Sequence, residues 1–205
     1  LSSADPQPII FVFTNSADKA QVALSPGFYA VSTESYSGWN NFLKDLSLVH
    51  EMVRRTYQPA YATRIGLRYI NRVTTTNTGA TTSGELLELI RAELTATLRG
   101  QVWENASEMI GVVNFSDPPA KMNLRYGYGF DETVSTFLLD FDYFEEGRLD
   151  LADVLSSCER YHEVIYRAFR WTIEDAALEV WCDGQYPKSH QTNRQARFTI
   201  FQFRY

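Results

Sequence analysis

The sequence predicts an α+β fold, with a largely antiparallel sheet and helices packed on one face, including a long C-terminal helix. Runs of strand character follow one another across short polar turns, which is typical of antiparallel strands. Other segments carry apolar residues at helical spacing, which is typical of helices that pack by one face. The 205 residues are 44% hydrophobic, and no segment resembles a linker, so we expect a single domain over residues 1–205.

The first elements are three short strands and a helix. Residues 8–24, PIIFVFTNSADKAQVAL, predict two strands around a polar turn. Residues 25–34, SPGFYAVSTE, predict a third strand that is entered through Pro26 and Gly27. Apolar residues at helical spacing predict a helix from Gly38 to Tyr57, and Pro59 ends it.

The middle of the chain alternates strands, a loop and a helix. Residues 63–73, TRIGLRYINRV, predict a strand, and residues 74–84, TTTNTGATTSG, predict a mobile loop. Helical spacing resumes from Gly84 to Leu98. Three further strands are expected at residues 108–116, 121–130 and 135–144, joined by short turns.

The longest predicted helix runs from Asp150, a suitable N-cap, to about Trp181. Cys158 falls on its apolar stripe, so we expect a buried thiol, and we expect His162 to be a hydrogen-bonded helix residue. Residues 182–195 predict a loop. Residues 196–205, ARFTIFQFRY, predict a last strand with aromatic residues on both sides, which suggests pairing within the sheet or across a homodimer.

The overall charge limits the partners that the protein can have. The formal net charge is −6, which argues against nonspecific binding of nucleic acid or of an anionic membrane, although a local basic patch remains compatible with it. No apolar run approaches the roughly 20 residues of a membrane span, and the first residues lack a signal-peptide pattern. We therefore expect a cytoplasmic protein. The two cysteines and three scattered histidines have no zinc spacing, and we predict no cofactor.

Three of the predicted strands combine an apolar face with a polar one, because side chains alternate along a strand. The apolar faces contain Ile65, Leu67, Tyr69 and Val73, then Met122, Leu124, Tyr126, Tyr128 and Phe130, then Phe137, Leu139, Phe141 and Tyr143. The second faces contain Arg64, Gly66, Arg68, Ile70 and Arg72, then Asn123, Arg125, Gly127 and Gly129, then Leu138, Asp140, Asp142 and Phe144, and most of these residues are polar or glycine. If the three strands are neighbours in register, these arginines and aspartates share one surface.

Three interpretations of this polar surface remain open. In the first, arginines and aspartates on neighbouring strands pair and only stabilise the sheet. In the second, the glycines open a depression or permit close backbone approach, and the arginines bind a phosphate or carboxylate. In the third, Asp140 and Asp142 bind a divalent cation. No phosphate loop or nucleophile elbow is present that would identify catalytic residues.

Two of these strands also resemble the hallmark segments of a sporadically distributed, uncharacterised prokaryotic protein family. The similar segments are RIGLRYINR (64–72) and FLLDFDYF (137–144) with the long helix after it, and LSPGFYAVST…Y.GW.NF, from Leu24 to Phe42, fits an earlier segment. The family opens with another strand and helical region, and its members have no counterpart of the residues after Trp181. We therefore expect residues 196–205 to take the sheet position of that opening strand. The patchy distribution suggests defence-type loci, but the resemblance implies no activity or cofactor.

The sequence thus favours a non-enzymatic binding protein that recognises an anionic ligand, of nucleotide or phosphate type, or an acidic protein partner. The expected binding residues are Arg64, Arg68, Arg72, Arg125, Gly66, Gly127, Asp140 and Asp142. The alternatives are a metal-dependent enzyme acting on nucleotides or nucleic acid, with Asp140 and Asp142 as ligands, and a structural subunit of a defence-type complex.

Overall fold

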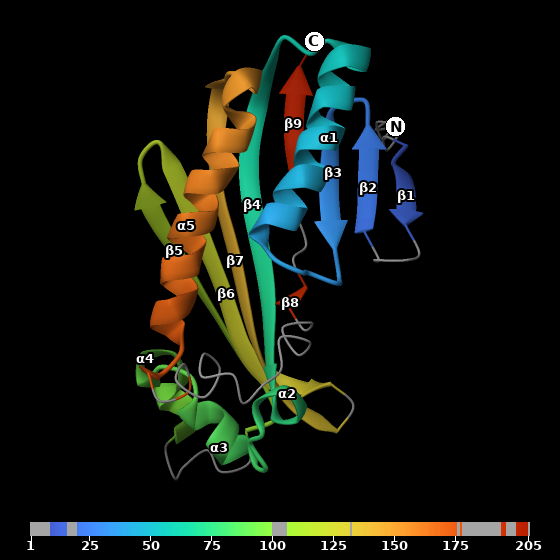
Figure 1. Cartoon of the computed structure of the whole chain (residues 1–205). Coiled ribbons are helices and arrows are strands. Elements are labelled where there is room, and N and C mark those ends of the chain that lie inside the picture. Colours follow the sequence, from blue (N-terminus) through green and yellow to red (C-terminus); the bar gives the residue numbers. More distant parts are fainter. Residues whose placement is uncertain are drawn as a thin grey trace, which may run out of the picture.

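A single antiparallel sheet organises the chain (Figure 1). The computed structural model describes residues 9–15, 20–99, 106–131, 133–175, 177, 194–195 and 200–204. The strands follow the order β1-β2-β3-β9-β4-β7-β6-β5, β8 pairs with β4, and every pairing is antiparallel. The strands are β1 (Phe11–Asn15), β2 (Ala20–Ser25), β3 (Phe28–Thr33), β4 (Tyr61–Thr74), β5 (Met109–Asp117), β6 (Ala120–Asp131), β7 (Val134–Leu149), β8 (Arg194–Gln195) and β9 (Ile200–Arg204). The predicted α+β class is confirmed.

Strand β9 joins two parts of the sheet that are otherwise separate. It pairs with β3 on one side, where Tyr29 lies opposite Phe201, and with β4 on the other, where Ala62 lies opposite Phe203. The predicted last strand is therefore present, and both of its edges are used within the chain. This strand is consequently not available for pairing across a homodimer.

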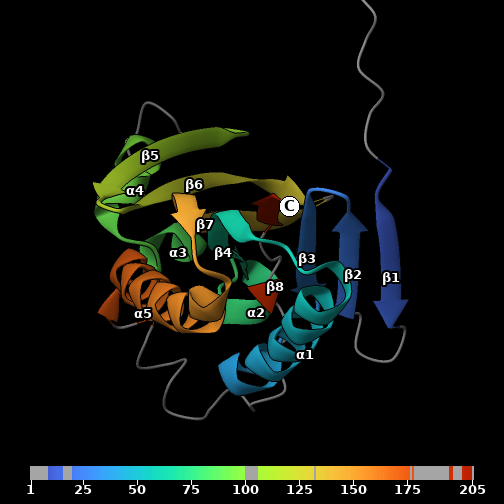
Figure 2. The same cartoon turned by 90° about the horizontal axis from the view of Figure 1, so that it is seen from above.

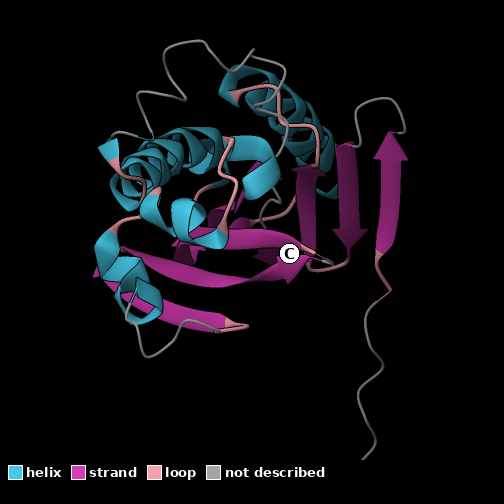
Figure 3. Cartoon of the chain, turned by 90° about the horizontal axis from the view of Figure 1, so that it is seen from below, coloured by secondary structure: helices cyan, strands magenta, loops and turns pink. Residues whose placement is uncertain are grey.

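Two long helices lie on the same face of the sheet (Figures 2 and 3). Helix α1 (Trp39–Tyr57) begins after Gly38 and ends at Gln58, which adopts the left-handed conformation. Helix α5 (Val154–Thr172) follows a 3₁₀ turn, η3 (Leu151–Asp153), in which the Ala152 N–H donates to the Asp150 carboxylate. We call this side of the sheet the helical face and the other side the open face. No described helix is long and apolar enough to cross a membrane.

Helix α5 is shorter than predicted. It ends at Thr172 because Ile173 adopts an extended conformation and forms a β-bridge with Ile90. Two backbone hydrogen bonds flank this bridge: Arg91 N–H donates to the Thr172 carbonyl, and Glu174 N–H donates to the Leu89 carbonyl. The expected continuation from residue 178 to Trp181 lies outside the described residues.

The same bridge interrupts the helix predicted at residues 84–98. In its place stand α3 (Ser83–Glu88), α4 (Ala92–Thr95) and the 3₁₀ helix η1 (Ala96–Arg99). The Arg99 guanidinium donates to the carbonyls of Leu87 and Ile90, so a tertiary contact replaces the helical hydrogen bonds at the break. The apolar spacing was real, since Leu86, Leu87, Ile90 and Leu94 are buried, but it spans three short elements.

The segment predicted as a mobile loop after β4 contains a helical turn, α2 (Thr75–Thr78). Thr74 and Asn77 form a capping box, in which each side chain accepts a hydrogen bond from the backbone N–H of the other residue. The Thr78 hydroxyl adds a hydrogen bond to the Thr74 carbonyl. The prediction of a loop was wrong at residues 75–78, because side-chain capping forms a helical turn in a Thr-rich sequence that periodicity alone leaves unassigned.

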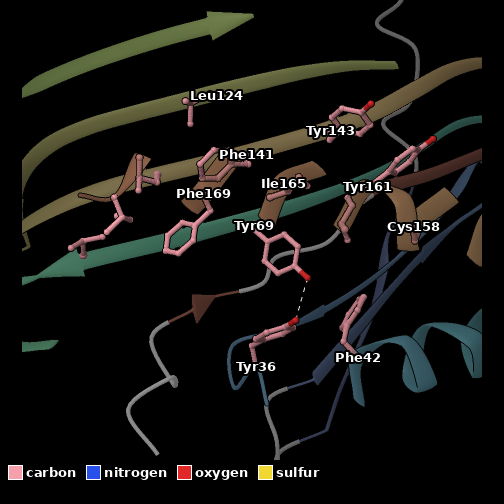
Figure 4. Packing of buried hydrophobic residues seen from close by; sticks show 14 of the residues in the cluster. Tyr36, Phe42, Tyr69, Leu124, Phe141, Tyr143, Cys158, Tyr161, Ile165 and Phe169 are labelled. Carbon is pink, nitrogen blue, oxygen red and sulfur yellow. Dashed lines mark hydrogen bonds between the residues drawn. The ribbon is translucent and has the colours of Figure 1, made fainter. Parts of the chain in front are cut away.

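The core lies between the helical face and the two long helices. Figure 4 shows Ile165 and Phe169 of α5 facing Phe141 of β7, with Tyr143 and Leu124 beyond them. Cys158 is fully buried here, as predicted, and burial raises the pKa of its thiol to about 12. Burial of these aromatic and aliphatic side chains is the main favourable term that holds α5 on the sheet.

Hydrogen bonds within the core tie α1 to the remaining elements. The His50 Nε2–H donates to the Leu151 carbonyl at 2.9 Å, so the neutral ring accepts at Nδ1 from the Tyr29 hydroxyl at 2.8 Å. His162 of α5 bonds the Tyr69 hydroxyl through Nδ1 at 2.9 Å, as expected for a hydrogen-bonded helix residue. The Trp39 ring stacks on His162 with centroids 4.4 Å apart.

Candidate anion-binding site

Strands β4, β7 and β6 lie side by side, and their register brings the predicted arginines and aspartates onto one surface. Arg68 of β4 lies opposite Asp142 of β7, and Arg125 of β6 lies opposite Asp140 of β7. The apolar partners follow on the other face, where Tyr69 and Leu124 both lie opposite Phe141. Because side chains alternate, the arginines and aspartates all project from the open face.

Three arginines of β4 are each held by an aspartate. Arg68 donates from Nε and Nη2 to the two oxygens of Asp140, both at 2.7 Å. Arg64 donates from Nη2 to both oxygens of Asp142 at 3.0 and 3.1 Å. Arg72 bonds Asp131, at the end of β6, at 2.6 Å. The pairs on β7 are diagonal, since the register places Ile70 opposite Asp140 and Glu146 opposite Arg64.

Arg64 covers the position where Gly66 leaves out a side chain. Its guanidinium lies over the Phe144 ring, 4.3 Å from the centroid. A Cβ at Gly66 would stand 2.8 Å from the Phe144 Cβ and 2.9 Å from Arg64 Nη1. Gly66 therefore makes room for this stacked arginine and does not open a depression.

The other two glycines of the surface differ from each other. A Cβ at Gly127 would stand 2.5 Å from the carbonyl oxygen of Met109, so this glycine permits close approach of the β5 backbone. A Cβ at Gly129 would meet no heavy atom within 4 Å. Of the two roles expected for the glycines, close backbone approach accounts for Gly127.

A small pocket of about 70 Å³ lies beside the Arg68–Asp140 pair. Its lining residues are Arg68, Asn123, Arg125, Asp140 and Asp142. Arg125 is exposed, and within the described part of the chain it forms no ion pair or side-chain hydrogen bond. The pocket thus brings together four of the eight predicted site residues, whereas Arg72 lies with Asp131 outside it.

The electrostatics of the pocket reflect these pairs. The hydrogen bond to Asp140 raises the pKa of Arg68, so its charge is fixed. Burial raises the pKa of Asp142 above its ordinary value, although the nearby Arg64 opposes this shift. Two arginines and two aspartates line the pocket, so its formal charges balance, and Arg125 is the exposed member of this group that has no ion pair among the described residues.

The two aspartates are poorly arranged as metal ligands. Both oxygens of Asp140 accept from Arg68, and both oxygens of Asp142 accept from Arg64, so a cation would have to displace a guanidinium. Among the described residues there is no group of three or more His, Cys, Asp or Glu side chains that could hold a metal ion.

Sequence reasoning did not select two residues that shape this surface. Asn123 lines the pocket next to Arg125, and its position on the polar face of β6 was a usable signal. Phe144 supports Arg64, but nothing in the sequence indicated that an aromatic ring on the polar face would carry a guanidinium.

Comparisons of the chain with protein-family models, with curated proteins and with solved structures find no significant match. The resemblance to the sporadic prokaryotic family therefore stays a prediction.

Proposed function

We propose that the protein is a non-enzymatic binding module that recognises one phosphate or carboxylate group at the pocket formed by Arg125, Asn123 and Arg68. The supporting observation is the contrast between Arg125 and the three arginines of β4. Those three donate to aspartates, whereas Arg125 has no such partner among the described residues. Its planar fork suits bidentate binding of an oxyanion.

The neighbouring groups assist this role. Asn123 supplies an amide that can donate to an oxyanion, and Arg68 contributes positive charge at the rim while Asp140 fixes its orientation. A pocket of about 70 Å³ accommodates a single charged group and leaves the rest of the ligand outside. The anion can therefore belong to a nucleotide or to an acidic side chain of a protein partner.

The experiment is a thermal-stability titration with three probes: inorganic phosphate, AMP and a short poly-glutamate peptide. Ligands that bind only the folded state raise the unfolding midpoint with concentration. We expect at least one probe to stabilise the wild-type protein and to lose that effect in Arg125→Ala. Arg72→Ala is the matched control, because it removes an exposed arginine outside the pocket.

Each outcome decides between the remaining interpretations. Stabilisation that survives Arg125→Ala, or no stabilisation by any probe, would leave the sheet-stabilising interpretation of these charges. Stabilisation that requires Mg²⁺ and disappears in Asp142→Asn would favour the metal-dependent enzyme acting on nucleotides.

A further inference from the structure

Strand β1 stands at the end of the sheet (Figure 2), and its described residues are exposed. Residues 9–13 are five consecutive apolar residues, each 50–70% exposed. The last three of them are the first residues of β1. β1 pairs with β2, and its other edge has no strand partner in the described residues. A continuous apolar run is typical of a strand that is covered on both faces, so this sequence is suited to a central strand.

The exposed apolar side chains are divided between the two faces of the strand. Side chains alternate along a strand, so Ile9, Phe11 and Phe13 share one face while Ile10 and Val12 share the other. Pairing of the β1 edge with another strand would satisfy its free backbone groups and would give each of these side chains an apolar neighbour across the interface.

The residues of β1 are complementary to a second copy of themselves. A two-fold axis through Phe11 would place Ile9 opposite the second copy's Phe13 and Ile10 opposite its Val12, with the two Phe11 residues facing each other. Every facing pair is then apolar on both faces of the sheet. An axis through Val12 would instead place Ile9 opposite Asn15, so the register at Phe11 is favoured.

The opposite end of the sheet lacks this complementarity. β5 also has an open edge among the described residues, with exposed Ile110 and Val112, but Gly111 and Asn114 interrupt its apolar run. Residues 9–15 contain no charged residue and no proline, the two common devices that block edge pairing.

We infer that the protein forms a homodimer by antiparallel pairing of β1 with the β1 of a second copy, which extends the sheet across the two-fold axis. A separate groove of about 320 Å³ lies on the helical face beside β1, between Phe13, Val22 and the exposed Leu48 of α1. A few side chains of another protein would fill that groove, and the test below distinguishes this occupant from a second copy.

The test measures the mass of the full chain in solution by light scattering and sedimentation. Three exposed positions are changed one at a time: Val12→Lys on the β1 edge, Val112→Lys on the β5 edge and Leu48→Glu on the groove. We expect a dimeric wild type, a twofold lower mass for Val12→Lys, and dimers for the other two variants. Circular dichroism and the unfolding midpoint establish that each variant is folded.

The register has its own readout. In a Cys182→Ser background, Phe11→Cys should cross-link two copies on oxidation, because the two-fold axis brings these residues together, whereas Asn15→Cys should not. A monomeric wild type, a dimer that survives Val12→Lys, or loss of the dimer only in Val112→Lys or Leu48→Glu would overturn the inference.

Discussion

Asp140 shows how a single charge on the open face is stabilised. Its carboxylate side chain is only 8% exposed and is bound at both oxygens by Arg68, whose side chain is 41% exposed. A buried carboxylate in this geometry depends on its partner, since the Asp140 carboxylate without Arg68 would be desolvated without compensation. The pair therefore contributes to stability only as a unit.

Replacing Asp140 with Asn should lower the free energy of unfolding by about 1–2 kcal/mol, because Arg68 would lose a bidentate charged acceptor. Chemical denaturation followed by circular dichroism measures this change. Asp131→Asn is the control, because it breaks the ion pair between Asp131 and Arg72. Both side chains of that pair are well exposed, and exposed pairs contribute about 0–1 kcal/mol. Equal losses of unfolding free energy in Asp140→Asn and Asp131→Asn would contradict a larger contribution from the buried pair.

Gly66 offers a second test at this scale. Gly66→Ala places a Cβ against Phe144 and the Arg64 guanidinium, so Arg64 must leave its stacked position or the strand must shift. We expect a loss of about 1–3 kcal/mol in unfolding free energy, as for other overpacked positions. Gly129→Ala, which meets open space, should be neutral or slightly stabilising, and the reverse order of the two variants would contradict the role of Gly66.

Among the elements, α1 is held through a titratable side chain. His50 bonds both Tyr29 of β3 and the backbone of η3, and burial lowers its pKa below the ordinary value. The folded state therefore binds this proton less readily than the unfolded chain does. The consequence is a stability that decreases as the pH falls through the ordinary histidine range.

We expect the free energy of unfolding to fall as the pH is lowered from neutrality to about 5, by no more than roughly 1.4 kcal/mol per pH unit for one proton. Denaturant titrations across this range measure the slope. His50→Gln should reduce the slope because position 50 no longer titrates, even if the variant is less stable throughout. Parallel curves for the wild type and His50→Gln would show that another group is responsible.

Element lengths show where sequence periodicity stops being informative. The apolar spacing correctly identified the buried residues at 84–98 and along α5, because burial is what such spacing reports. It could not locate the breaks, since these depend on the bridge between Ile90 and Ile173, two residues far apart in the chain. The Arg99 guanidinium also bonds the carbonyls of Leu87 and Ile90, 12 and 9 residues earlier, and the apolar spacing does not indicate these contacts.

At the scale of the whole molecule, the sequence predicted the class of the fold and the shared polar surface of β4, β6 and β7. Alternation along each strand is enough to divide its residues between two faces, so Arg68 and Asp140 were expected on one surface. The diagonal pairing was not predictable, because it depends on the exact register and on the twist of the strands. The order of the strands was not predictable either, since no local sequence pattern places β9 between β3 and β4.

The position of β9 leads to a prediction for hydrogen exchange. Strands paired on both sides exchange their amides slowly, and β9 has neighbours along both edges. We expect the amides of residues 200–204 to be protected to a degree comparable with those of β4. The amides of β1, at the end of the sheet, serve as the less protected comparison in the monomeric Val12→Lys variant. Rapid exchange at residues 200–204 would contradict the insertion of β9.

The same insertion has a consequence for protein synthesis. Strand β9, which joins β3 to β4, is translated more than a hundred residues after both of them. During that interval the nascent chain carries two unsatisfied strand edges, which are attractive to chaperones and to neighbouring nascent chains. We therefore expect the slow step of folding during synthesis to be the insertion of β9 between β3 and β4, and not the formation of the helices.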